Sequence, residues 1–109
     1  MRTLLAAMAI AIAIAMASAS TASADVVIVN QEQKKFSVTE ITVKRGQSVT
    51  FVNSDPFTHN VYSVTPGMSF DLHVQKPDQR DVVTFDTPGE AAVRCAIHPQ
   101  MKLTIKVAP

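Results

Sequence analysis

Residues 41–52 read ITVKRGQSVTFV, two alternating apolar and polar runs on either side of a turn at Arg45-Gly46-Gln47. An alternation with a period of two predicts half-buried β-strands, and the glycine marks the turn between them. Similar short runs recur along the chain, most of them closed by proline or glycine, and no stretch after residue 25 keeps a helical apolar period. We therefore predict an all-β chain, a Greek-key β-sandwich of about seven to eight strands.

The first 24 residues carry a different pattern. Arg2 gives a positive start, residues 4–16 form an unbroken apolar run, and Ala22-Ser23-Ala24 ends a small, polar stretch. This order predicts a secretory signal peptide over residues 1–24, cleaved before Asp25, with an uncleaved anchor as the alternative. The apolar run is too short to span a bilayer comfortably. One domain, residues 25–109, with no membrane span, would remain in the periplasm.

Charge and cysteine content narrow the possible functions. The formal net charge is +1 and no basic stripe is present, so binding to nucleic acid is not predicted. Cys95 is the single cysteine, and an unpaired thiol is unusual in an exported protein. Either this thiol is buried and free, or it is bound to a metal.

The segment that carries chemistry is Cys95-Ala96-Ile97-His98-Pro99-Gln100-Met101. A strand is predicted to enter at Cys95 and another to leave at Met101, so a thiolate, an imidazole and a thioether surround one point. His59 opens a strand upstream, and loops at the same end of a sandwich converge. Two histidines and a cysteine with a weak axial methionine make the blue-copper arrangement. The predicted metal ligands are therefore His59, Cys95, His98 and Met101.

Each of these residues has a simpler explanation when it is taken alone. His59 is then a surface residue at the start of a strand, His98 a turn residue, and Met101 a filler of the core. The combined spacing favours the metal site. The third histidine, His73, ends an alternating run near Asp71 and is expected to face solvent.

At these residues the sequence resembles the cupredoxins, in particular the plastocyanin/amicyanin group of small copper proteins. Residues 43–53, the segment 59–61 and the loop 95–101 are similar to that group's strand-turn-strand, first-ligand segment and short ligand loop. The resemblance implies that the Asn60 backbone N–H bonds the Cys95 sulfur and that the Asn60 side chain ties the two ligand loops together. Ala96 departs from the pattern, because many relatives have serine or threonine there.

The resemblance implies one type 1 copper ion and one-electron transfer between protein redox partners of unknown identity. The alternatives are a periplasmic copper-binding or delivery protein and a metal-free interaction domain. No acid–base pair or open coordination site is apparent, so the chain is predicted to be a carrier without catalytic residues and not an enzyme. We also expect it to be a monomer. We expect electrons to pass at the exposed edge of His98, within an apolar rim formed by Pro56, Phe57, Pro99, Pro66 and Met68.

Overall fold

The structure is a computed structural model that describes residues 26–109. The signal peptide predicted for residues 1–24 lies outside these described residues. Within residues 26–109 all regular secondary structure is β-strand, and no helix there has the length and apolar character needed to cross a membrane. The all-β class predicted from the alternating runs is confirmed.

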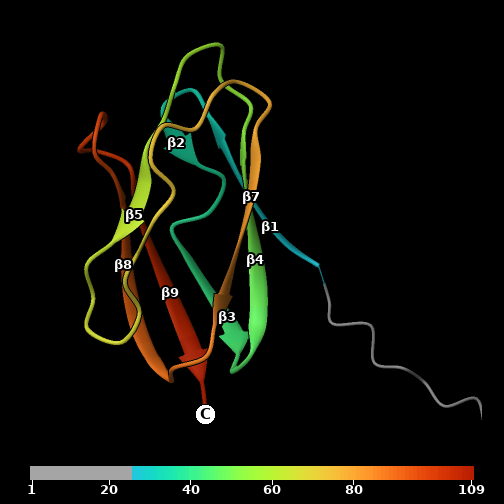
Figure 1. Cartoon of the computed structure of the whole chain (residues 1–109), viewed down its shortest axis with the longest axis vertical. Helices are drawn as coiled ribbons and strands as arrows, with labels where there is room; N and C mark the ends of the chain where they lie inside the picture. The colour runs from blue at the N-terminus through green and yellow to red at the C-terminus, as the bar shows by residue number, and fades with distance from the viewer. Residues whose placement is uncertain (1–25) are drawn as a thin grey trace, which may run out of the picture.

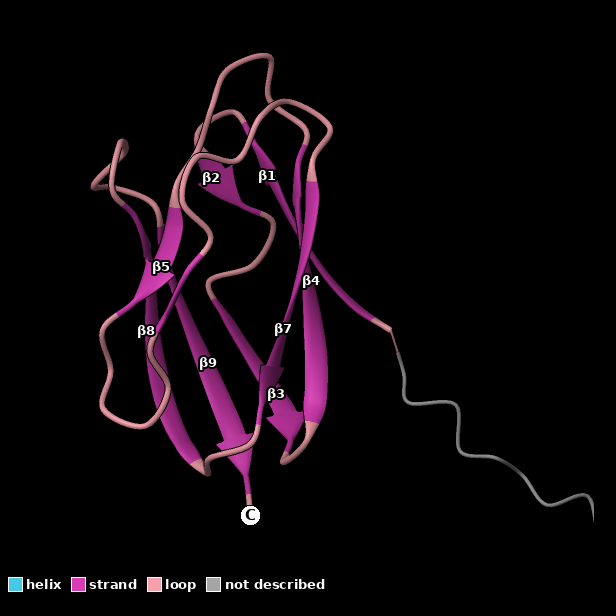
Figure 2. Cartoon of the chain, in the orientation of Figure 1, coloured by secondary structure: helices cyan, strands magenta, loops and turns pink. Residues whose placement is uncertain are grey.

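Nine strands make up the described part of the chain, two of which are only two residues long. In chain order they are β1 (Val27–Glu32), β2 (Lys35–Phe36), β3 (Glu40–Lys44), β4 (Gln47–Asn53), β5 (Val61–Ser63), β6 (Phe70–Asp71), β7 (Arg80–Phe85), β8 (Gly89–Cys95) and β9 (Lys102–Ala108). One sheet has the order β2-β1-β4-β7 and the other β3-β9-β8-β5-β6. The two sheets face each other as the predicted sandwich (Figures 1 and 2).

The stretch at residues 41–52 passes from one sheet to the other instead of forming a hairpin. Strand β3 pairs in parallel with β9, whereas β4 pairs with β1 and β7. Gly46, in the turn between β3 and β4, has a φ of 85° and donates its N–H to the Phe85 carbonyl at 2.7 Å. Glycine adopts this conformation without the steric cost that a side chain brings. It thereby allows the chain to change sheets within a short turn.

Apolar side chains from both sheets fill the space between them. Phe51 of β4 and Leu103 and Ile105 of β9 are fully buried. Along β9 the buried residues alternate with more exposed ones, whereas the end of β4 from Phe51 to Asn53 is buried throughout. The Phe51 ring packs against Phe70 with 5.8 Å between the ring centroids. Close packing of this kind resists deformation, so it supplies a rigid frame for the loops at the ends of the strands.

Four connecting segments meet at the upper end of the sandwich in Figure 1. They comprise residues 33–34, 54–60, 72–79 and 96–101, and we call this end the ligand-loop end. Strand β8 begins at the opposite end with Gly89 and finishes here with Cys95, about 20 Å away at the rise of a β-strand. Val61 of β5 lies opposite Cys95 in the sheet, so the predicted ligands of both segments reach the same end.

Candidate metal centre

His59 lies in the backbone immediately before β5 and is fully buried. It forms an isolated antiparallel bridge with Gln75, in which the His59 N–H donates to the Gln75 carbonyl at 3.0 Å and the Gln75 N–H donates back at 2.8 Å. Two reciprocal backbone bonds hold the residue in place although it lies outside the longer strands. His59 was predicted to open a strand; it lies instead in an isolated bridge two residues before β5.

A buried polar network supports this bridge. The Asn53 side-chain amide donates to the Gln75 carbonyl at 3.0 Å and to the Phe57 carbonyl at 2.8 Å, and its oxygen accepts the Asp55 N–H at 2.9 Å. The Gln75 side chain accepts a bond from Gln31 at 2.6 Å and donates to the Phe51 carbonyl at 2.9 Å. Gln31, Asn53 and Gln75 are each fully buried. Except at Gln31 Oε1, which is buried without a partner, these groups are hydrogen-bonded. Buried networks of this kind restrict a loop to one conformation.

Asp55 fixes the orientation of the His59 ring. Its Oδ2 lies 2.6 Å from His59 Nε2, and it also accepts backbone N–H groups, from Gln33 to Oδ1 at 2.6 Å and from Lys34 to Oδ2 at 3.1 Å. Burial alone would raise the pKa of this carboxyl, but the bonds from His59, Lys34 and Gln33 outweigh burial and lower it. An ionised carboxylate only accepts, so Nε2 carries the proton and Nδ1 keeps its lone pair for a metal.

Cys95 ends β8 and is buried, with its sulfur beside the His59 segment. The Asn60 backbone N–H points to Cys95 Sγ at 3.4 Å, and the Ala96 N–H donates to the Asn60 carbonyl at 3.0 Å. The hydrogen bond to sulfur expected from the resemblance is therefore present. Hydrogen bonds to a ligating sulfur are among the features that tune a copper site.

His98 occupies the middle of the loop between β8 and β9. The Met101 N–H donates to the His98 carbonyl at 2.9 Å, which closes a turn and directs the ring back toward Cys95. The ring is half-buried and packs against Phe57, with 5.5 Å between centroids. Burial lowers the pKa of His98, and His59 and Lys34 lower it further against a smaller opposing effect of Asp55. A lowered pKa favours the neutral imidazole, which is the form that binds metals.

Three donor atoms converge at the ligand-loop end. His98 Nδ1 lies 3.1 Å from His59 Nδ1, and Cys95 Sγ lies 3.7 Å from His59 Nδ1 and 3.8 Å from His98 Nδ1. A point equidistant from the three atoms is about 2.1 Å from each, close to the roughly 2.0–2.3 Å of zinc–imidazole and zinc–thiolate bonds. These three residues therefore form a potential set of metal ligands: His59, Cys95 and His98. A soft thiolate together with two imidazoles suits copper.

Met101, the predicted fourth ligand, is almost fully buried directly before β9. It belongs to the same cluster of buried apolar residues as Cys95. Both a thioether near the metal and a core methionine would occupy this position. The axial role of Met101 stays a prediction.

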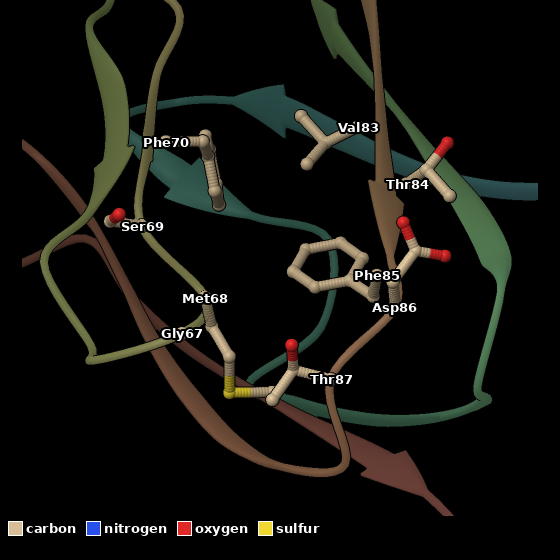
Figure 3. A pocket seen from close by; sticks show the side chains of 9 residues that line it. All are labelled: Gly67, Met68, Ser69, Phe70, Val83, Thr84, Phe85, Asp86 and Thr87. Carbon is tan, nitrogen blue, oxygen red and sulfur yellow. The ribbon is translucent and has the colours of Figure 1, made fainter.

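Two further residues bear on the predictions made from the sequence. His73 is exposed in a turn with a φ of 55°, and its backbone N–H donates to Asp71, as expected of a solvent-facing residue. Pro66 and Met68 were expected in the rim around His98, and this is wrong, because the loop between β5 and β6 that carries both lies at the other end of the sandwich. The Met68 sulfur lies beside Gly89, at the opposite end of β8 from Cys95. Met68 and Gly67 line a pocket there with Phe85 and Thr87 (Figure 3).

The Asn60 side chain shows the consequence of alanine at position 96. Its Oδ1 atom is buried and has no hydrogen-bond partner. The backbone of Ala96 is bonded to the Asn60 carbonyl, so the two residues are neighbours, but the alanine methyl offers no donor. An unsatisfied buried oxygen costs stability. The side-chain tie between the ligand loops that the resemblance implies is therefore incomplete at this oxygen.

Comparison with known proteins gives consistent matches. Residues 23–108 match the plastocyanin/azurin family, described as copper binding proteins. Amicyanin-alpha of Methylorubrum extorquens is 34% identical over 71 residues, which span 62% of this chain and 60% of that protein. A solved amicyanin mutant in the Cu(I) state has a TM-score of 0.71 at 26% identity, over 76% of this chain and 82% of its own. The copper-containing nitrite reductase of Thermus scotoductus also scores 0.71, at 27% identity, over 77% of this chain but 22% of the reductase.

Replacement of Asp55 by asparagine should weaken metal binding. The neutral amide is a poorer acceptor for His59 Nε2–H and no longer enforces its tautomer, so we expect copper affinity to fall by about 10–100-fold. Competition with a chelator of known affinity measures the change. Asp71→Asn, at an exposed aspartate, is the matched control and should leave affinity unchanged. Equal affinity of the Asp55 variant and the wild type would show that the carboxylate does not position His59.

Replacement of Ala96 by serine should stabilise the protein. A hydroxyl at this position supplies the donor that Asn60 Oδ1 lacks, and we expect a gain of about 0.5–1.5 kcal/mol in the free energy of unfolding. Denaturant titration of the metal-free protein measures the gain. Ala92→Ser on the exposed face of β8 is the control and should change little. A gain no larger than that of the control would mean that the hydroxyl does not reach Asn60.

Proposed function

Because the chain belongs to the plastocyanin/azurin family of copper-binding proteins, we propose that it carries single electrons between protein redox partners. Copper supplies a one-electron Cu(II)/Cu(I) couple when it is bound. The chain binds copper, and we propose His59, Cys95 and His98 as the equatorial ligands and Met101 as the axial one. The observation that carries the proposal is the convergence of the three donor atoms within 3.1–3.8 Å of one another.

The local structure favours electron transfer because the donors are held from several directions. His59 is fixed by the Gln75 bridge and by Asp55, and Cys95 by β8 and the Asn60 N–H. A site that is fixed before the metal changes its charge needs little reorganisation, in the way preorganised sites lower reaction barriers. The proposed ligand residues therefore favour electron transfer mainly because they keep their positions when the charge of the metal changes.

His98 offers the route by which electrons enter and leave. It is half-buried, whereas His59 is fully buried. Two exposed prolines lie close to these histidines in the sequence, Pro56 before His59 and Pro99 directly after His98. Phe57 contacts both imidazoles, at 5.4 Å from His59 and 5.5 Å from His98. A small apolar contact area of this kind suits the brief, weak encounters of redox proteins.

Burial of the donors supports a carrier over a delivery protein or an enzyme. His59 and Cys95 are 0% and 2% exposed, so release of copper to an acceptor would require the loop end to open. The Asp55 carboxylate is already bonded to His59 and to two backbone N–H groups, so it is poorly placed to act on a substrate. The likeness to a nitrite reductase covers only 22% of that enzyme, which is consistent with a shared domain.

The copper protein should absorb intensely in the visible because of charge transfer from the Cys95 thiolate to Cu(II). Cys95→Ser should abolish the band, whereas His73→Gln, at a histidine outside the cluster, should retain it. Two measurements separate a carrier from a delivery protein. A carrier should give a reversible voltammogram, and it should keep its copper through repeated oxidation and reduction in the presence of a Cu(I) chelator. Loss of copper to the chelator in a few cycles would contradict the carrier proposal.

Replacement of Met101 by leucine tests the axial ligand. The equatorial histidines and cysteine supply most of the affinity, so copper should stay bound. The reduction potential should rise, because a weak donor that stabilises Cu(II) is removed. Met68→Leu, at the opposite end of the sandwich, is the control and should leave the potential unchanged. A Met101 variant with an unchanged potential would remove Met101 from the ligand set.

We also propose that the protein is exported to the periplasm as a monomer after removal of residues 1–24. The support is the sequence of a charged start, an apolar run and Ala22-Ser23-Ala24. Mass spectrometry of the periplasmic fraction of an expressing bacterium should find a chain that begins at Asp25. Replacement of Ala24 by a bulky residue should block the cleavage. Recovery of the uncleaved chain from membranes would favour an anchor instead.

A further inference from the structure

We propose that a lysine-rimmed hollow beside the metal centre docks a carboxylate-rich surface of a protein redox partner, a proposal that rests on the electron-transfer function above. The hollow has a volume of about 430 Å³ and lies between the turn that joins β1 to β2 and the loop that precedes β9. Lys34, Lys35 and Lys102 line it, together with Phe36 and Met101. We call it the lysine hollow.

The charge of the lysine hollow is of one sign. Three lysines line it, and no aspartate or glutamate does. Three acidic residues lie near the lysine hollow but do not line it. Asp55 is bonded to His59, and Glu40 forms an ion pair with Lys106, with 3.0 Å between Oε1 and Nζ. Glu32 lies opposite Lys35 in the pair of strands β1 and β2. A concentration of one charge attracts the opposite charge and accelerates encounter with it.

The rim and the floor of the lysine hollow differ in chemistry. All three lysines are exposed, whereas Phe36 is 8% and Met101 1% exposed. Because the two apolar side chains are already almost covered, the exposed ammonium groups supply the contact. A protein surface with several carboxylates can bond more than one of these lysines at once, which favours it over a single free anion.

The lysine hollow is connected to the metal centre through direct contacts. Lys34 Nζ stands 5.6 Å from the centroid of the Phe57 ring, and that ring contacts His98 at 5.5 Å. The backbone N–H groups of Gln33 and Lys34 are bonded to Asp55, the carboxylate that orients His59. A partner held at Lys34 therefore lies next to the half-buried imidazole through which we propose that electrons pass.

The turn that carries Lys34 is already ordered without a partner. Gln33 and Lys34 have φ values of 54° and 56°, a conformation that non-glycine residues seldom adopt unless other bonds hold them. The two bonds to Asp55 supply that restraint. Because the turn does not have to be ordered on binding, the entropic cost of docking is reduced.

A peptide titration tests the lysine hollow without depending on electron transfer. Hexaglutamate added to the ¹⁵N-labelled Cu(I) protein at low ionic strength should shift the amide signals of residues 33–36 and 100–102. Lys35→Glu and Lys102→Glu should each weaken binding at least fivefold. Lys44→Glu makes the same charge change at the far end of β3 and should weaken it less than twofold. Shifts spread over all lysines, equal effects of the three variants, or binding to anionic lipid vesicles but not to hexaglutamate would overturn the proposal.

A rate measurement then tests whether the lysine hollow serves electron exchange. Oxidation of the reduced protein by hexacyanoferrate(III) should slow at least threefold in Lys35→Glu and Lys102→Glu at low ionic strength, and this difference should shrink at high salt. Lys44→Glu should change the rate by less than about 1.5-fold, and all three variants should keep the wild-type visible spectrum. Equal rates in the three variants would overturn the docking role. Absence of the visible band in the wild type would instead overturn the electron-transfer function, whatever hexaglutamate does.

Discussion

The hydrogen bond between His59 Nε2 and Asp55 Oδ2, at 2.6 Å, is the interaction on which the proposed metal centre depends. It holds the proton on Nε2, and therefore directs the lone pair of Nδ1 toward Cys95 and His98. The same carboxylate binds the turn between β1 and β2, so one buried residue orders a ligand and an outer turn together. Asn53 and Gln75 in turn hold Asp55 and the His59 backbone in place.

The sandwich brings together proposed metal ligands that are far apart in the sequence. His59 and Cys95 are separated by 36 positions, but the pairing of Val61 with Cys95 places their segments side by side. The Asn60 N–H and the Ala96 N–H then join the two segments across this pair. Because β8 lies between β9 and β5, the strand that ends at Cys95 is hydrogen-bonded on both sides, and the two histidines lie around its sulfur. The rigid frame and the polar network together produce a fixed site. Such a site suits a metal ion that changes its oxidation state while it stays in the same position.

The sequence was sufficient for features that depend on local pattern and failed for those that depend on how loops close. The alternation around Gly46 predicted strands in the right places, and the spacing of Cys95, His98 and Met101 predicted the loop. The sequence analysis missed Asp55, Gln31 and Gln75. The run Asn53-Ser54-Asp55-Pro56 is equally typical of an exposed turn, and single glutamines such as Gln31 and Gln75 are usually exposed. An aspartate four residues before a ligand histidine was the signal available for Asp55. Met68 was misplaced because the direction of the loop between β5 and β6 follows from sheet order.

On this account the protein holds its donor atoms in the binding arrangement before the metal arrives. Crystal structures of the metal-free, Cu(I) and Cu(II) forms at one pH measure this directly. A preformed site predicts that His59 Nδ1, Cys95 Sγ and His98 Nδ1 keep their positions to within about 0.5 Å among the three forms. An imidazole of His59 that leaves Asp55 and turns away from Cys95 when the metal is removed would contradict the claim.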